Sequence, residues 1–151
     1  MKLQSLISVL TNQEKNLKKL LEIINQKKDA LVGSNYELLN KLVNKEEQSL
    51  LDIQLTEEER LKITKDLFEQ YEITSDRYKL EILLNSLVNK VDSRITQEIG
   101  DSEKRIKNTI KEITRVNHLN MVLIQQSRSL ISQTIEAVLN TNTKSILDRK
   151  G

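Results

Sequence analysis

The 151-residue sequence has no cysteine, proline or tryptophan, and only three glycines, one phenylalanine and three tyrosines. Without cysteine the chain can form neither a disulfide bond nor a thiolate metal site. So little proline and glycine leaves few residues for tight turns, which disfavours strands and hairpins and favours a few long helices. The sequence therefore predicts an all-α fold: one domain over residues 1–151, built as an elongated antiparallel helical bundle or coiled coil of three long helices and one shorter helix.

The residue patterns that catalysis and cofactor binding require are also missing. His118 is the single histidine, so clusters of histidine and cysteine around a metal are excluded, and no Glu-x-x-His pair of the kind found in di-metal bundles is present. The two internal glycines, Gly33 and Gly100, are 67 residues apart, too far for a phosphate-binding loop. We therefore expect no catalytic residue, no metal and no cofactor, and we interpret the protein as not being an enzyme.

The composition argues against two further classes of partner. The net charge is only +2, and the basic run Lys104, Arg105 and Lys107 has no interleaved aromatic residues, so we expect no nucleic-acid partner. No apolar run reaches membrane-spanning length, and the first apolar run is too short and interrupted for a signal peptide, so we expect no stable membrane insertion. These absences predict a cytoplasmic protein.

Charge is distributed unevenly along the chain. Residues 1–34 carry six bases and three acids (+3), residues 35–75 carry five bases and ten acids (−5), and residues 101–151 carry nine bases and five acids (+4). An acidic segment between two basic ones predicts that the second helix packs beside both the first and the last. Ordinary solvated helix faces would give the same pattern, so this alternative stays open.

Apolar residues recur at helical spacing in four stretches. The pattern predicts helices at approximately residues 2–32, 35–71, 76–92 and 101–141, followed by a disordered tail at 142–151. Between the first two helices, Gly33 suits the left-handed position that ends a helix. Ser34 and Glu37 then form the S-x-x-E pattern of a capping box, so an αα-hairpin is expected here.

Two boundaries leave alternatives open. Thr56 and Glu59 repeat the T-x-x-E pattern inside the second helix, which favours either an unbroken helix or a fresh start near residue 56; we favour the unbroken helix. Residues 92–101 form either a loop or part of one helix that bends at Gly100.

The stretch from Val116 to Thr143 is the least charged part of the chain, with only Arg128 and Glu136 bearing formal charges. Read as a helix, it carries two adjacent apolar rows at seven-residue spacing, and a helix that is apolar on more than one side needs more cover than one neighbour provides. Its own chain, a second copy or a client could supply that cover. Asn117 and Asn120 lie among these rows, either buried, where they would fix register or partner choice, or facing water.

The order of these motifs carries a resemblance to a known family. The sequence reads ALVGS at 30–34, EExxLL at 46–51, ERL at 59–61 and NxxNxxLIxxS at 117–127. This order resembles the FlgN family of bacterial flagellar export chaperones over about residues 3–140. Relatives often carry an aromatic, glycine-containing tail, whereas this chain ends KSILDRKG without tyrosine.

The resemblance implies a cytoplasmic chaperone of the flagellar type III export apparatus. Its clients would be the hook-associated subunits of the hook–filament junction, held by their C-terminal amphipathic helix, and the cytoplasmic part of the export gate is a further partner. We predict a client-binding surface formed by Asn117, Leu119, Asn120, Leu123, Ile124, Leu130, Ile131, Ile135, Val138 and Leu139.

Two alternatives stay open. The same residues could form the protein's own core against the first two helices. The chain could also be a self-associating helical-bundle adaptor without an export role, in which case the apolar rows would be a homodimer seam.

Overall fold

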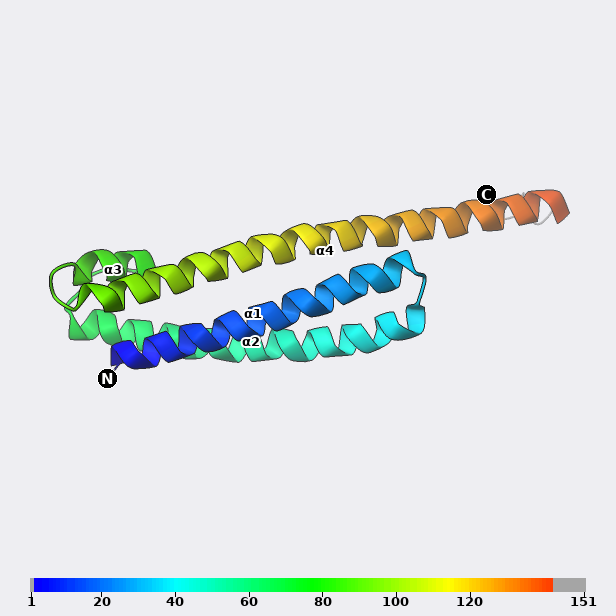
Figure 1. The fold of residues 1–151 in the computed structure, drawn as a ribbon. Coiled ribbons are helices and arrows are strands. Elements are labelled where there is room, and N and C mark those ends of the chain that lie inside the picture. Colours follow the sequence, from blue (N-terminus) through cyan, green and yellow to red (C-terminus); the bar gives the residue numbers. More distant parts are fainter. Residues whose placement is uncertain (1, 143–151) are drawn as a thin grey trace.

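The computed structural model describes residues 2–142, except the side chains of residues 127, 128, 130, 131, 134 and 139–142. Four helices follow one another: α1 (Lys2–Val32), α2 (Tyr36–Gln70), α3 (Leu80–Leu87) and α4 (Ser93–Asn142). The described part of the chain contains no strand, and the three long helices pack side by side into an elongated bundle (Figure 1). The predicted all-α fold class is confirmed.

Helix α1 is the central element of the bundle. It packs against α2 on one side and α4 on the other, while α2 and α4 do not approach each other within the described residues (Figure 1). The prediction that the second helix packs beside both the first and the last is therefore half wrong: the backbone of α2 runs beside α1 but does not come close to that of α4.

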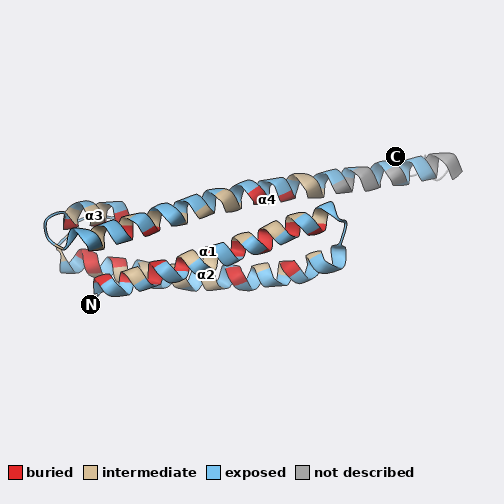
Figure 2. Ribbon diagram, in the orientation of Figure 1, coloured by how far each residue is buried: buried red, intermediate tan, exposed pale blue. Residues whose placement is uncertain are grey.

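The sequence of α1 explains its central position, because it carries buried residues on two faces (Figure 2). Ile23 and Ala30 form a buried cluster with Leu42 of α2, and Leu20 and Ile24 form another with Val116 of α4. Complete burial of one such aliphatic side chain contributes roughly 1.5–3 kcal/mol. Both outer helices are thus attached to α1 through apolar contacts.

The α1–α2 turn differs from the prediction in its details. Ser34, not Gly33, adopts the left-handed conformation, with φ of 54°, and no glycine in the described residues has a positive φ. The Asn35 amide donates to the Ala30 carbonyl (2.8 Å) and the Ser34 amide to the Leu31 carbonyl (3.2 Å), which is the hydrogen-bond pattern of a Schellman motif. The helix cap of α2 is Asn35, whose side chain accepts from the Leu38 amide (3.2 Å), so the predicted capping box led by Ser34 is wrong.

Helix α2 runs without a break through Thr56. The Thr56 hydroxyl donates to the carbonyl of Asp52 one turn earlier (2.9 Å), which a threonine inside a helix can do without ending it. The helix ends at Gln70, where Glu72 takes the left-handed conformation with φ of 52°.

The third and fourth helices have different bounds from those predicted. Helix α3 covers only Leu80–Leu87 of the predicted 76–92, because Asn89, with φ of 65°, turns the chain. Helix α4 begins at Ser93 rather than near residue 101 and passes through Gly100. The Asp92 carboxylate accepts from the Arg94 amide (3.0 Å) and so caps α4, a signal that the sequence analysis missed. Of the tail predicted at 142–151, residue 142 still belongs to α4, and residues 143–151 lie outside the described residues.

Helix α3 completes a four-helix core at one end of the molecule. Leu83 and Leu87 are fully buried among Leu6 of α1, Phe68 of α2 and Ile99 of α4. The ring of Tyr78, just before α3, meets Phe68 edge to face with centroids 5.3 Å apart. Beyond α3 the bundle has only three helices.

Candidate functional site

The C-terminal part of α4 projects past the rest of the bundle (Figure 1). The side-chain amide of Asn120 donates to the carbonyl of Ile24 in α1, over 3.1 Å. Helices α1 and α4 run in the same direction (Figure 1). Helix α1 ends at Val32, eight residues beyond Ile24, so its end lies about level with position 128 of α4, eight residues beyond Asn120. We call residues 129–142 the arm; at 1.5 Å per residue it is about 21 Å long.

The structure places the predicted site residues in three settings. Asn120 is 2% exposed and belongs to the protein's own core, next to Val116. Leu123 and Ile124 are half-buried where α4 leaves α1, whereas Asn117 and Leu119 are exposed there. On the arm, Ile135 and Val138 are 48% and 53% exposed. The side chains of Leu130, Ile131 and Leu139 lie outside the described residues.

These exposed side chains give the arm the character of an unpaired bundle helix. Ile135 and Val138 are three residues apart and therefore lie on the same side of the helix. An amphipathic helix that presents such a row can bury it against the groove or helix of another chain. The chemistry available here is apolar burial and not proton transfer, and the described residues form no acid or histidine cluster able to hold a metal ion.

A second feature, which the sequence analysis missed, is an open trough beside the end of α3. The trough has a volume of about 580 Å³ and lies over α1, with α2 on one side and α4 on the other. Its apolar lining comprises Leu10, Leu17, Ile53, Tyr78, Leu80, Ile106 and Ile110. It exists because α3 begins only at Leu80, while the three long helices extend beyond that level of the bundle. The trough therefore continues the position that α3 occupies in the four-helix core.

The trough has a buried polar residue in its lining. Gln13 of α1 is 5% exposed, and its side-chain amide donates to the Ile53 carbonyl of α2 (3.1 Å). Its carbonyl oxygen is buried without a hydrogen-bond partner among the described residues. A buried polar group without a partner costs free energy, so Gln13 is a locally destabilising residue in the floor of the trough.

Four of the six charged residues that line the trough are paired with each other, and the other two, Lys79 and Glu81, carry opposite charges. Glu57 of α2 accepts two hydrogen bonds from the Arg60 guanidinium, one of them over 2.9 Å. On α4, Lys107 donates to Glu103 over 3.0 Å, and this hydrogen bond raises the pKa of Lys107. The rim therefore presents balanced charge to any helix that enters.

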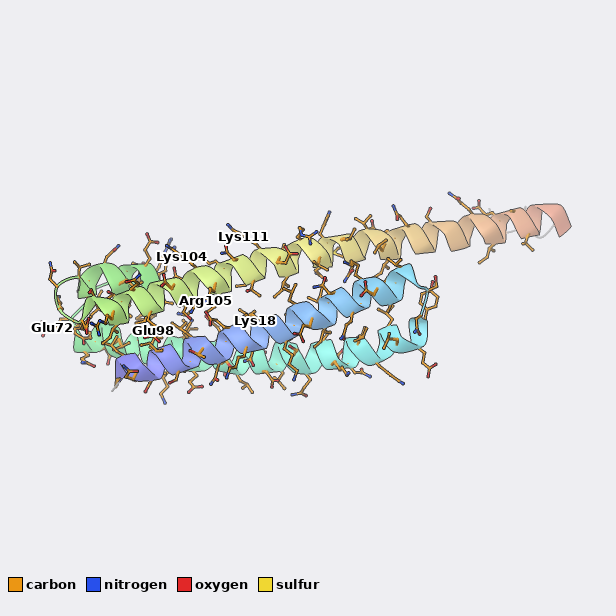
Figure 3. All side chains as sticks on the ribbon, in the orientation of Figure 1. Lys18, Glu72, Glu98, Lys104, Arg105 and Lys111 are labelled. Atoms are coloured by element: carbon orange, nitrogen blue, oxygen red, sulfur yellow. The ribbon has the colours of Figure 1, made fainter. Side chains whose placement is uncertain are left out.

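The basic run at residues 104–107 is divided among different directions. Arg105 turns toward α1 and donates to Glu14 over 2.7 Å, whereas Lys104 and Lys111 lie on the outer side of α4 (Figure 3). Glu14 also accepts from the Ser102 hydroxyl over 3.0 Å, so this carboxylate joins α1 to α4. The run is thus partly used to hold the bundle together and does not form one continuous cationic surface.

The comparisons with known proteins agree with this architecture. The model of the family described as FlgN protein matches residues 1–147, which is nearly the whole chain. No curated protein and no solved structure matches the chain. None of the described helices is both long enough and apolar enough to cross a membrane. The chain belongs to the FlgN family, a family of flagellar export chaperones and not of enzymes.

Proposed function

We propose that this protein is a cytoplasmic chaperone that holds hook-associated subunits of the hook–filament junction by their C-terminal amphipathic helix before flagellar type III export. Membership of the FlgN family supports an export-chaperone role in general. The structural observation that carries the proposal is the arm, where Ile135 and Val138 are about half exposed beyond the end of α1.

The proposed client surface begins where α4 leaves α1 and continues along the arm. Leu123 and Ile124 are half-buried at this junction, so a client helix can continue the bundle's own apolar contacts without a gap. We retain Leu130, Ile131 and Leu139 in the surface on the ground of their sequence spacing. Asn117 and Leu119, both exposed, form its edge, whereas Asn120 holds α4 to α1.

The energetics of such a complex depend on apolar area. A client tail that folds on binding loses conformational entropy, and burial of apolar surface at roughly 25 cal/mol per Å² offsets this loss. The cytoplasmic part of the export gate is a second proposed partner. It would receive the loaded chaperone.

Calorimetry tests the proposal directly. The full chain is titrated with a peptide that spans the C-terminal helix of a hook–filament junction subunit from the same organism. We expect one-to-one binding with a negative heat-capacity change, the signature of apolar burial. No heat, from a folded protein and a soluble peptide, would reject the assignment.

A matched pair of variants locates the surface. The double variant Ile135→Ser/Val138→Ser should weaken peptide binding at least tenfold with unchanged helicity, because both side chains lie on the arm and neither is in the core. The control is Leu55→Ser, which removes an exposed leucine from α2 on the surface shared with Asn12 of α1, away from the arm. Equal loss of binding in both variants would speak against the arm as the binding surface.

A further inference from the structure

The helices fill three corners of a square four-helix arrangement and only part of the fourth. Within the described residues, the backbones of α1 and α3 each run beside α2 and α4, but α1 is not beside α3 and α2 is not beside α4. Helix α3 therefore lies in the corner diagonally opposite α1. It is only eight residues long, so it fills this corner beside the start of α4 and no further (Figure 1). The trough is the open continuation of the same corner.

We propose that the C-terminal amphipathic helix of the client lies in the trough, in line with α3, and completes a four-helix bundle with α1, α2 and α4. This inference rests on the proposed function and extends the client surface from the arm into the body of the protein. The arm is a single helix and can cover one side of a client helix. The trough is lined by three helices and can cover more of its circumference.

Helix α3 shows which side chains fit this corner. Its buried residues are Leu80, Leu83 and Leu87, at spacings of three and four residues, which place them on one face of the helix. The trough offers apolar side chains of the same kind, among them Leu17 of α1 and Ile53 of α2. A client helix with leucine-type residues at the spacing of α3 would bury them, as in helix-in-groove recognition.

One apolar stripe on α4 connects the trough to the arm, and this continuity indicates the client helix as the occupant. Four isoleucines share the stripe: Ile106 and Ile110 in the trough, the half-buried Ile124 where α4 leaves α1, and Ile135 on the arm. At 100° per residue they lie within about 40° of one another around the helix. From residue 106 to residue 135 the stripe is about 44 Å long. A single client helix can therefore follow it from the trough to the arm without changing direction.

The charges at the rim are compatible with a partner that binds through an apolar row. The pair of Glu57 and Arg60 lies within α2, and the pair of Glu103 and Lys107 lies within α4. Each pair can stay formed while a helix enters, so none of these four charges has to be buried without its partner, which would be costly. Since both signs are present on each side, a strongly acidic or strongly basic helix has no advantage, and apolar side chains select the partner.

Peptide titration of a trough variant tests the proposal. The peptide is the C-terminal helix of a hook–filament junction subunit from the same organism. Ile110→Lys should weaken its binding at least tenfold, with helicity retained because Ile110 is 45% exposed. The matched control is Leu55→Lys, on a residue of α2 that is 56% exposed and does not line the trough, and it should bind like the parent. Unchanged binding by Ile110→Lys would overturn the proposal.

Cross-linking locates the bound peptide, and the absence of cysteine from the chain makes single-cysteine variants unambiguous. Ile110→Cys and Leu55→Cys proteins are each mixed with peptides that carry one cysteine, moved along the apolar row of the helix. At least one peptide position should form a disulfide with Ile110→Cys far more efficiently than with Leu55→Cys. Equal linkage to the two proteins at every peptide position would overturn the proposal.

The results separate this proposal from the proposed function and from another occupant. Peptide binding that Ile135→Ser/Val138→Ser weakens and Ile110→Lys does not would reject the trough and leave the chaperone assignment in place. No binding by the folded parent protein would reject both. A dimer in light scattering that Ile110→Lys dissociates and the peptide does not would assign the trough to a second copy and also overturn the proposal.

Discussion

The side-chain amide of Asn120 donates a hydrogen bond over 3.1 Å to the backbone carbonyl of Ile24, so a buried polar side chain attaches α4 to the central helix. The other side-chain atom of this amide, Oδ1, is buried without a partner among the described residues. The contact therefore fixes where α4 lies on α1 while leaving one acceptor unsatisfied. A contact of this kind specifies register more than it adds stability.

The Asn120 contact predicts that two substitutions at this position change the free energy of unfolding by very different amounts. Asn120→Leu should change the free energy of unfolding by less than about 1 kcal/mol, because it removes the unsatisfied acceptor together with the hydrogen bond. Asn120→Asp should cost about 3 kcal/mol, because it places a carboxylate against the Ile24 carbonyl without a donor. Urea unfolding followed by circular dichroism measures both, and an Asp variant as stable as the parent would contradict this account.

The ion pair between α1 and α2 is partly buried and predicts an asymmetric pair of substitutions. Lys27 is 9% exposed, and its Nζ lies 2.9 Å from Glu46 Oε2. Glu46→Ala should cost about 3 kcal/mol because it leaves a buried ammonium without a partner. Lys27→Met should cost less, because Glu46 is the more exposed of the two and can be hydrated. A double-mutant cycle by urea unfolding checks the coupling, and equal costs would contradict the asymmetry.

The four-helix end predicts a large cost for a single truncation in α3. Leu83 is fully buried in the cluster with Leu6 and Phe68, so Leu83→Ala should cost about 3 kcal/mol through lost burial and the cavity left behind. The control Leu61→Ala, on a residue of α2 that is 41% exposed, should cost less than about 1 kcal/mol. Thermal and urea unfolding measure the loss of stability in each variant. Similar losses in the two variants would argue against α3 as a packed element.

The outer face of α4 predicts a pH effect on one carboxylate. The Arg115 guanidinium donates to Glu112, with Nε lying 3.1 Å from Oε2, and this hydrogen bond lowers the pKa of Glu112. The pKa of Glu112 is lower in the folded than in the unfolded protein. The ionised carboxylate therefore stabilises the folded state at pH values above the unfolded-state pKa, and this stabilisation is lost as the pH falls through the folded-state pKa. Arg115→Gln should raise the pKa of Glu112 toward its ordinary value. Carbon-detected NMR titration measures it; an unchanged pKa would mean that the pair is not formed in solution.

Apolar periodicity predicts the first helix but does not show that two of its faces are buried. Besides the row that includes Leu10, Leu17 and Ile24, α1 has a row at 9, 16, 23 and 30, in which Ile23 and Ala30 pack with Leu42 of α2. That second row has the same seven-residue spacing, so a signal was present. Asn16 interrupts it, and only the structure shows that this amide donates to Thr56 of α2 over 3.0 Å.

Turn and cap positions were recognised only approximately. The sequence predicts a turn near residue 33, but several small polar residues there can serve as caps. Ser34 takes the left-handed conformation and Asn35 becomes the cap, and their choice depends on how closely α2 must approach α1. The same holds at Asp92, which caps α4 because α3 ends five residues earlier at Leu87.

The sequence alone determined that this chain is helical, where its apolar rows lie and which family it resembles, because helical periodicity and turn composition are local properties. Only the tertiary structure decided that α1 is central, that Asn120 is buried while Ile135 and Val138 are exposed, and that a trough opens beside the N-terminal end of α3. An apolar row in a sequence indicates that one face of a helix must be buried against another element. Which helix supplies the cover depends on the lengths and offsets of helices distant in sequence, and these are fixed only when all of them pack together.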